Sequence, residues 1–245
     1  MIAWGVDKAP SRGPSRGLSH DRIVSAAMEI ADRDGLPAVT MQAVAKSLGF
    51  TTMSLYRYVS NKDELMTLMQ DAAMRGLAEL PSEGGWEDRL RTWAEGIRED
   101  YRRHPWALDI PHGQASVLMP NSVRVADLGM AAMEELPLPD DVKIAVILTL
   151  SELTMSMTSL ELSLATEGGV RLTSDETERL GTVITEERFP HIARLFQAGG
   201  FVVEPQSPPV DDGTPTDDSA PADTNVDDEF VFALELVFGG IRSLL

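Results

Sequence analysis

Residues 39–66, VTMQAVAKSLGFTTMSLYRYVSNKDELM, decide the fold of the N-terminal part of this chain. They hold no acidic residue before Asp63, although the 245-residue chain has a formal net charge of -18 and a pI of about 4.5. Thr40 can cap a helix that Gly49 ends, and a second, very short helix is expected over about residues 52–58. A helix, a glycine-containing turn and a short second helix are typical of a helix-turn-helix, whose second helix lies in the major groove of DNA.

Charge is distributed unevenly along the chain. Residues 1–62 contain eight Lys or Arg and five Asp or Glu, whereas the remaining residues contain 13 bases and 34 acids. A strongly acidic region repels nucleic acid through its long-range field. Any contact with DNA should therefore be confined to the N-terminal part of the chain.

The composition narrows the class of protein. Hydrophobic residues make up 43% of the chain, enough for a core, and the absence of Cys excludes disulfides, thiolate catalysis and Cys-ligated zinc. Residues 1–18 have too few consecutive apolar residues for a signal peptide and are interpreted as a flexible basic arm. These features favour a cytoplasmic protein.

One long apolar run covers residues 144–164. It contains Glu152 and Glu161, and a bilayer span would have to bury both carboxylates at a large cost in free energy. We therefore expect a buried helix of a soluble protein and no membrane partner.

The spacing of apolar residues is helical along most of the chain, with no sustained alternation of period two. Caps and breakers predict helices over about residues 20–34, 41–48, 52–58, 61–80, 86–104, 121–135, 140–166, 174–188, 190–198 and 228–245. Residues 203–227 hold five Pro and six Asp and are expected to form a disordered acidic loop. The predicted fold class is all-α.

Specific residues strengthen the helix-turn-helix prediction. From Thr40 onward the pattern T-x-x-x-V-A-x-x-L-G-F-x-x-x-S-L-Y-x-Y-V-x-N-K-x-E-L closely resembles the DNA-binding domain of the tetracycline-repressor (TetR) family. The segments GWEDRLRTWAEGIREDYRRHPWALDIP, PNSVRVADLGMAAMEEL and FVFALELVFGGI resemble the C-terminal domain of the tetracycline-repressor type. The resemblance covers about residues 19–168 and 228–243. It implies a helix-turn-helix domain over 19–64 and a helical ligand-binding and dimerisation domain over 65–245.

The resemblance also implies which side chains contact DNA. They are Thr40, Gln42, Thr51, Thr52, Met53, Ser54, Tyr56, Arg57, Tyr58 and Lys62. Tyr hydroxyls, Thr hydroxyls and an ammonium in the first turn of a helix suit phosphate, whereas Gln suits adenine and the Thr or Met methyl groups suit thymine.

Each assignment has an alternative. Thr40 and Thr51 could serve only as helix caps, and Tyr56 could pack in the core and leave Tyr58 alone exposed. Arg57 could read a guanine or only touch phosphate. For Arg12 and Arg16 a solvated tail competes with minor-groove contact, which Arg22 could also make.

In this family a small molecule bound in the C-terminal domain changes the spacing of two recognition helices on a palindromic operator, so the resemblance implies a repressor released by an effector. Its candidate ligand-binding residues are Trp93, Tyr101, His104, Trp106, His112, Asn121, Met155 and Ser159. Aromatic walls with a few polar groups are typical of small-molecule sites, and thioethers favour a largely apolar or aromatic effector. Trp93 could instead belong to the core, and His104 could cap a helix.

A homodimer is the expected assembly. The helices over 140–166 and 228–245 offer apolar residues that a monomer could hardly cover, although the two helices could also pack on each other within one chain. These residues are Ile144, Ile147, Leu148, Phe230, Leu234, Val237, Phe238 and Ile241.

Three other functions stay open. The four His form no metal-spaced pair, and the chain has no Ser elbow, Walker loop or G-x-G-x-x-G, so an enzyme is disfavoured and no cofactor is expected. A metal-responsive regulator could use His104, Asp109 and His112. A regulator of the same fold could also respond to a protein partner through the loop 203–227.

Overall fold

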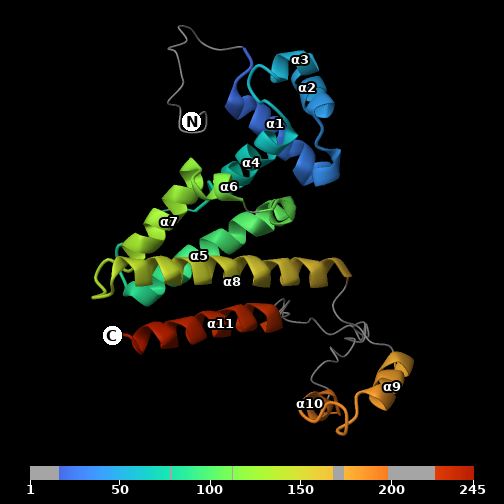
Figure 1. Cartoon of the computed structure of the whole chain (residues 1–245), viewed down its shortest axis with the longest axis vertical. Helices are drawn as coiled ribbons and strands as arrows, with labels where there is room; N and C mark the ends of the chain where they lie inside the picture. The colour runs from blue at the N-terminus through green and yellow to red at the C-terminus, as the bar shows by residue number, and fades with distance from the viewer. Residues whose placement is uncertain (1–16, 78, 112, 168–173, 198–223) are drawn as a thin grey trace, which may run out of the picture. The chain divides into compact units, whose positions relative to one another are not determined.

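The computed structural model describes residues 17–77, 79–111, 113–167, 174–197 and 224–245, and within these ranges it contains helices and no strand (Figure 1). Residues 1–159 with 228–245 form one compact unit, and residues 160–227 form a second. Most of the expected basic arm and of the acidic loop 203–227 lies outside the described residues. The loop prediction was wrong at its end, because the last helix already begins at Thr224.

The N-terminal domain begins with α1 (His20–Asp34), η2 (Leu36–Ala38), α2 (Met41–Leu48) and α3 (Thr52–Leu55). The predicted ends of α1 are confirmed: the Ser19 hydroxyl accepts from the Arg22 amide at 3.3 Å, and Gly35 ends the helix at a φ of 81°. Ile23, Val44 and Leu55 contribute fully buried side chains. The three helices therefore pack around shared apolar side chains, which belong to the same hydrophobic core as those of the body.

The fourth helix, α4 (Lys62–Ala73), is shorter than expected. The sequence pattern predicted that it would continue up to Pro81. The chain turns away after Met74, and the amide of Gly76 donates to Asp100 Oδ2 at 3.1 Å. A Cβ atom on Gly76 would lie 2.0 Å from Asp100 Oδ1, so this close approach requires glycine.

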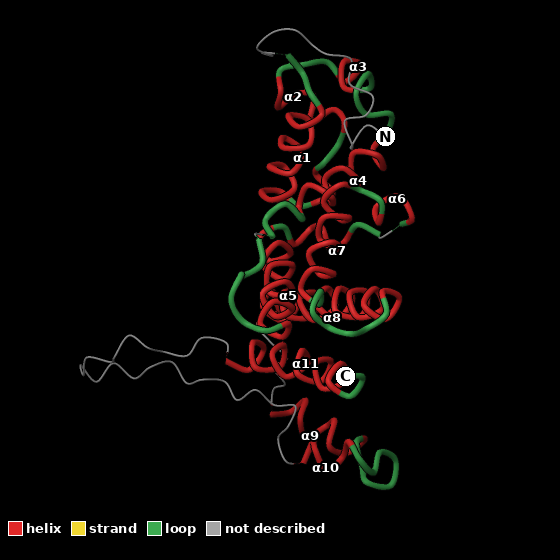
Figure 2. Tube along the Cα trace, turned by 90° about the vertical axis from the view of Figure 1, so that its left-hand side faces the viewer, coloured by secondary structure: helices red, strands yellow, loops and turns green. Residues whose placement is uncertain are grey.

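The helical body of the first unit follows. It comprises α5 (Trp86–Arg103), η3 (Pro105–Asp109), α6 (Gln114–Val117), α7 (Pro120–Ala132) and most of α8 (Asp140–Glu167) and α11 (Thr224–Arg242). The apolar face of α5 packs in the core, since Leu90, Trp93, Ile97 and Tyr101 are all buried. In Figure 2, α4 extends from the N-terminal domain toward α7 in the body, and α4 packs against α6, α7 and η3.

A network of charged side chains holds α11 against α5. Arg242 bonds both carboxylate oxygens of Glu87 at 2.7 Å and Glu235 at 3.1 Å, and Arg91 bonds Glu235 at 2.6 Å. Beside this network the rings of Trp86 and Phe238 meet edge to face with centroids 5.6 Å apart. The C-terminal helix is therefore fixed to the body by both apolar and ionic contacts.

The long apolar helix α8 was expected to be buried, but it is buried along one face only. Leu150, Thr154 and Thr158 are fully buried, whereas Ile144 is 44% exposed and Leu148 is 58% exposed. Within the described residues, Asp140–Ala165 is the single helical stretch whose length and composition would allow a membrane span. Its buried face packs in the core of the first unit.

The second unit contains α9 (Ser174–Val183) and α10 (Ile192–Gln197), which pack against each other. The first ends at Val183, before the predicted end at residue 188, because residues 185–189 form a separate turn. The second begins at Ile192 and not at residue 190, while its predicted end at 198 lies outside the described residues. In this turn the carbonyl of Thr185 accepts from the amides of Arg188 at 3.1 Å and Phe189 at 2.8 Å.

Candidate nucleic-acid interface and effector cavity

The turn between α2 and α3 has the geometry of a helix-turn-helix. Gly49 adopts a left-handed conformation with a φ of 75°, and the amide of Phe50 donates to the carbonyl of Ala45 at 2.9 Å. This closure of a helix C-terminus favours glycine and redirects the chain sharply. Leu55 then anchors α3 in the core, so α3 is held against α2 while its other residues face outward.

All ten predicted DNA-contacting residues lie at the start of α2, in α3 with its following turn, or at the start of α4. Seven are exposed: Thr40, Gln42, Thr51, Met53, Tyr56, Arg57 and Lys62. Thr52, Ser54 and Tyr58 are half-buried. Met53 is 74% exposed, which is unusual for so apolar a side chain. This exposure agrees with a side chain that contacts a binding partner.

The exposure of the two tyrosines is the reverse of the alternative in which Tyr56 packs in the core and Tyr58 alone is exposed. Tyr56 is 45% exposed, whereas Tyr58 packs against the core. The ring of His20 meets the Tyr58 ring edge to face at 5.4 Å, and His20 Nε2 lies 2.8 Å from the Tyr58 carbonyl oxygen. The start of α1 therefore holds the turn that follows α3.

The threonines also differ from each other. The Thr40 hydroxyl accepts from the Ala43 amide at 3.0 Å and so caps α2 as expected. The Thr51 side chain makes no cap bond, and its Oγ1 lies 2.9 Å from Ser54 Oγ instead. Thr51 therefore holds the N-cap position of α3 as expected but does not cap the helix through its side chain, and the Thr51–Ser54 pair places two hydroxyl groups at the start of α3.

Lys62 is the first residue of α4 and is exposed. Asn61 caps this helix: its Oδ1 accepts from the Glu64 amide at 2.8 Å, and Glu64 Oε2 accepts from the Ser60 amide at 2.6 Å. The Glu64 amide is already bonded, whereas the exposed ammonium of Lys62 could bind an anion.

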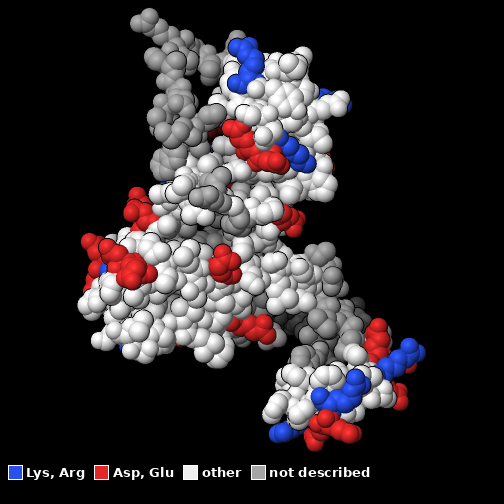
Figure 3. Space-filling view, in the orientation of Figure 1, with Lys and Arg blue, Asp and Glu red and all other residues white. Residues whose placement is uncertain are grey.

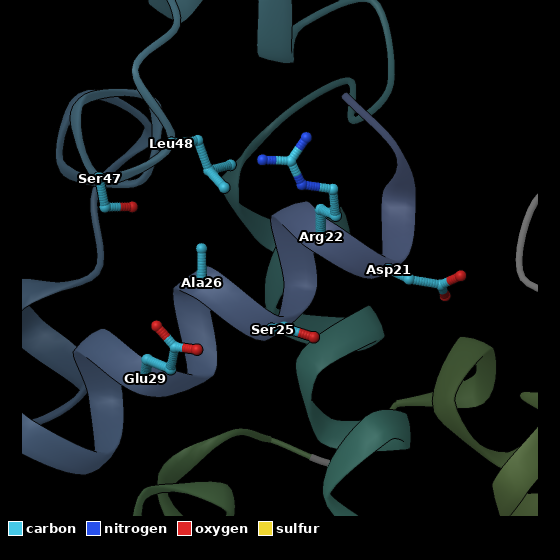
Figure 4. A pocket seen from close by; sticks show the side chains of 7 residues that line it. All are labelled: Asp21, Arg22, Ser25, Ala26, Glu29, Ser47 and Leu48. Carbon is cyan, nitrogen blue, oxygen red and sulfur yellow. The ribbon is translucent and has the colours of Figure 1, made fainter. Parts of the chain in front are cut away.

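The surface charge follows the uneven sequence. On the face shown in Figure 3, the Lys and Arg atoms of the first unit lie mainly on the N-terminal domain, whereas the body presents mainly Asp and Glu. A second feature of this domain is an open hollow of about 300 Å³ between α1 and α2 (Figure 4). Asp21 and Glu29 line it beside Arg22, so the hollow is poorly suited to phosphate.

The body contains a cavity of about 190 Å³ between α4, α5, α6, α7 and α8. Apolar side chains form most of its wall: Met74, Ile97, Val117, Val125, Ala126, Ile147, Leu148 and Met155. The polar side chains that line it are Gln70, Tyr101, Ser116, Ser122, Ser151 and Glu152. An apolar wall with a few polar groups is the arrangement typical of small-molecule sites.

Two of the predicted ligand-binding residues, Tyr101 and Met155, line this cavity. Burial, together with the nearby charges of Glu152 and Asp100, raises the pKa of the Tyr101 hydroxyl to about 12. Trp93 does not line the cavity; it is fully buried behind the wall and donates through Nε1 to the carbonyl oxygen of Val125 at 2.7 Å.

The five other predicted ligand-binding residues lie elsewhere or outside the described residues. Asn121 donates to Asp71 on α4, Ser159 is exposed away from the cavity wall, and His112 lies outside the described residues. His104 and Trp106 both bond one oxygen of Asp32 on α1, at 2.9 and 2.5 Å. These two side chains therefore connect the body to the N-terminal domain.

The sequence pattern missed the contribution of α4 to the cavity. Gln70 and Met74 lie one helical turn apart and both line it, and Gln70 also donates to the carbonyl oxygen of Ile110 at 3.1 Å. A polar Gln on the otherwise apolar face of α4 was the signal available in the sequence.

Within the ranges that the structure describes, no three His, Asp or Glu side chains are grouped so that they could hold a metal ion. His104 is bonded to Asp32. The described residues therefore give no geometric support to a metal-responsive site.

Two protein-family models match the sequence. Residues 23–69 match the model described as bacterial regulatory proteins, tetR family, and residues 79–204 match the tetracyclin repressor-like C-terminal domain. The second match alone covers more than half of the chain.

Curated relatives match over part of their length. The HTH-type transcriptional repressor DrrR1 of Streptomyces coeruleorubidus is 46% identical over 112 residues, which are 44% of this chain and 41% of DrrR1. An HTH-type transcriptional regulator of Saccharopolyspora erythraea is 40% identical over 92 residues, 37% of this chain and 39% of that protein. The chain thus matches about two fifths of the length of each relative.

Solved structures share the fold over three quarters or more of the chain. The Streptomyces coelicolor TetR family protein ActR, in complex with (S)-DNPA, has a TM-score of 0.69 at 21% identity and covers 94% of this chain and 100% of its own. BioQ with its double-stranded DNA operator has a TM-score of 0.54 at 20% identity, covering 75% of this chain and 98% of its own. From the two family matches and this shared fold, the chain belongs to the TetR family of bacterial transcriptional regulators, with an N-terminal DNA-binding helix-turn-helix domain.

Proposed function

We propose that this chain is a cytoplasmic repressor that binds a palindromic operator as a homodimer and is released by a small, largely apolar or aromatic effector. The observation that carries the proposal is the position of α4. Lys62 begins this helix beside the helix-turn-helix, while Gln70 and the following Met74 line the cavity at its other end. A ligand that contacts Gln70 or Met74 would therefore act directly on α4, the helix that begins with Lys62.

The DNA surface is proposed to be formed by the ten residues of α2, α3 and the start of α4. Gln42 and Met53 are exposed and suit base edges, and Lys62 with the Thr40 hydroxyl suits phosphate. No acidic residue occurs from position 39 to position 62, so no carboxylate within this segment opposes the approach of phosphate.

The dimer surface is proposed to be formed by α8 and α11, which lie side by side in both views of the first unit (Figures 1 and 2). The residues expected from the sequence differ in exposure. Phe230, Leu234, Phe238 and Ile241 are buried within the chain, as is Ile147; Val237 is half-buried, and Ile144 and Leu148 remain exposed.

The outer face of α11 adds apolar side chains that the sequence pattern did not single out. Val231 is 42% exposed, and Phe232 and Leu236 are each 64% exposed. Contiguous exposed apolar side chains on neighbouring helices are typical of a surface that a partner covers. A two-fold partner that brings its own α8 and α11 would cover both faces at once.

The effector role is supported by the cavity and by one relative solved with two ligands. ActR has been solved in complex with (S)-DNPA and with actinorhodin. The two structures align to this chain at 21% and 23% identity, so they support a ligand site in the same fold and do not identify the ligand.

The test is a selection of bound duplexes from random DNA, followed by affinity measurements at several salt concentrations. We expect a palindrome. Lys62→Ala should weaken binding to every sequence and lower the salt slope by about one, whereas Gln42→Ala should change the base preference at one position of each half-site. Ser25→Ala, exposed on α1 beside the hollow of Figure 4, is the matched control. Equal affinities and salt slopes in all four proteins would refute the surface.

A further inference from the structure

The described wall of the cavity carries an acidic side chain and no basic one. Glu152 on α8 is the only ionisable acid or base among its lining residues apart from the phenol of Tyr101, and the described wall contains no Lys, Arg or His. The bases nearest in sequence on α7 and α8 are Arg124 and Lys143, and neither belongs to the wall. The cavity therefore offers one negative charge and no positive charge to a ligand.

Glu152 also has no partner among the residues that the structure describes: it makes no ion pair or hydrogen bond there. The other acids that face the body's helices behave differently. Asp71 is bonded by α7, and Asp100 is bonded by Gly76 and Arg103. Among these carboxylates, Glu152 is the one that is open to a ligand.

From this arrangement we infer that the effector is a lipophilic cation: an apolar, preferably aromatic body that carries a protonated amine, with Glu152 as its counter-ion. The inference deepens the proposed function, because it rests on the same cavity being the effector site. The apolar body would lie against Met74, Ile97 and Ile147, which belong to the apolar part of the cavity wall.

Tyr101 fits the same ligand in two ways. Its hydroxyl stays protonated at neutral pH, because its pKa is raised to about 12 by burial and by the charges of Glu152 and Asp100. The neutral ring can offer its face to a cation. An anionic ligand would meet Glu152 without any base to offset the repulsion, so carboxylate and phosphate ligands are disfavoured.

The test uses three probes that share a naphthyl body and differ in the charge of the head group: 2-naphthylmethylammonium, 2-naphthylmethanol and 2-naphthoate. Calorimetric titration of the full chain gives the affinity for each probe. We expect the ammonium probe to bind about tenfold more tightly than the alcohol, since the carboxylate is partly exposed and the attraction is screened by water, and the carboxylate probe to bind most weakly.

Glu152→Gln keeps the shape of the side chain and removes its charge. In this variant the ammonium and alcohol probes should bind equally, while binding of the alcohol should stay as in the wild type. Asp127→Asn, on the exposed side of α7, is the matched control for losing one negative charge from the body and should keep the tenfold preference. The preference of the wild type should also fall with rising salt.

Equal binding of ammonium and alcohol to the wild type, a preference that survives in Glu152→Gln, or no binding of the ammonium probe would each overturn the inference. Operator affinity without any probe is measured on the same proteins. This measurement separates a failure of the inferred ligand class from a failure of the proposed function. Retained operator binding with no cation preference would overturn the ligand class alone. Loss of any operator preference in the wild type would overturn the proposed function.

Discussion

Asp71 on α4 closes the N-terminus of α7 by bonding Asn121. Its Oδ1 accepts from the Asn121 amide at 2.8 Å and from the Ser122 amide at 3.1 Å, and its Oδ2 accepts from Asn121 Nδ2 at 2.8 Å. A carboxylate suits a helix N-terminus because it satisfies free amides and complements the helix dipole. Asp71 is only 7% exposed, so the helix that carries Lys62 is joined to the cavity wall by a buried charged contact.

Asp71→Ala should lower the free energy of unfolding by about 1–3 kcal/mol, because it leaves the Asn121 and Ser122 amides without their acceptor. Urea denaturation measures the loss. Asp127→Ala, which removes an exposed acid of α7, should change stability by less than about 0.5 kcal/mol. Similar losses in the two variants would contradict a special role for Asp71.

Two buried threonines one turn apart on α8 make a matched pair. The Thr154 hydroxyl is buried without a hydrogen-bond partner, whereas the Thr158 hydroxyl donates to the Thr154 carbonyl at 2.7 Å. Thr154→Val should leave stability unchanged or raise it by up to about 1 kcal/mol, and Thr158→Val should lower it by about 1 kcal/mol. Thermal denaturation distinguishes the two; a comparable loss of stability in both would show that the Thr154 hydroxyl has a partner.

The contacts of Arg242 should make stability sensitive to acid. Its hydrogen bond is the main cause that lowers the pKa of Glu87 below the usual 4.5, and Arg91 followed by Arg242 lowers the pKa of Glu235. A carboxyl whose pKa is lower in the folded state stabilises the fold above its unfolded pKa and loses that contribution as pH falls through its folded pKa. The melting temperature of the wild type should therefore fall more steeply below about pH 4.5 than that of Arg242→Met.

The control for this pH dependence is Arg33→Met. Arg33 also lowers the pKa of Asp34, but the two are neighbours in sequence and can pair in the unfolded chain. Arg33→Met should leave the acid dependence of the melting temperature as in the wild type. If both substitutions flatten it equally, the network between α5 and α11 is not the cause.

Phe232→Asp should break the proposed dimer. Phe232 is 64% exposed, so an Asp there leaves the chain folded but places a charge in the apolar surface between two subunits. Sedimentation velocity should show a dimer for the wild type and a monomer for the variant, with a corresponding loss of operator affinity. Val123→Asp, on α7 and 37% exposed, should remain dimeric. A dimeric Phe232→Asp protein would place the subunit contact elsewhere.

Local sequence signals predicted the N-terminal domain closely. Ser19, Thr40 and Gly49 mark helix ends that depend on hydrogen bonds within a few residues, and the structure confirms all three. The end of α4 could not be predicted in this way. Met74 to Leu77 continue an apolar helical pattern, and the turn that interrupts it depends on Asp100, which is distant in sequence.

The cavity depends on the packing of five helices, and periodicity says which face of a helix is apolar without saying which residues of that face leave a space. Trp93 and Ile97 lie on one stripe of α5, yet Trp93 fills the core and Ile97 lines the cavity. His104 and Trp106 looked like ligand residues because they are aromatic and polar, but their partner is Asp32 on α1, a contact between distant parts of the chain.

Leu148 belongs to two surfaces at once: it lines the cavity, and it is among the exposed apolar residues of α8. A bound ligand and a second subunit would then touch the same side chain. Thermodynamic reciprocity requires that, if the ligand alters the affinity between subunits by some factor, pairing of the subunits alters the affinity for the ligand by that same factor. The apparent strength of the inducer would in that case vary with the cellular abundance of the regulator itself.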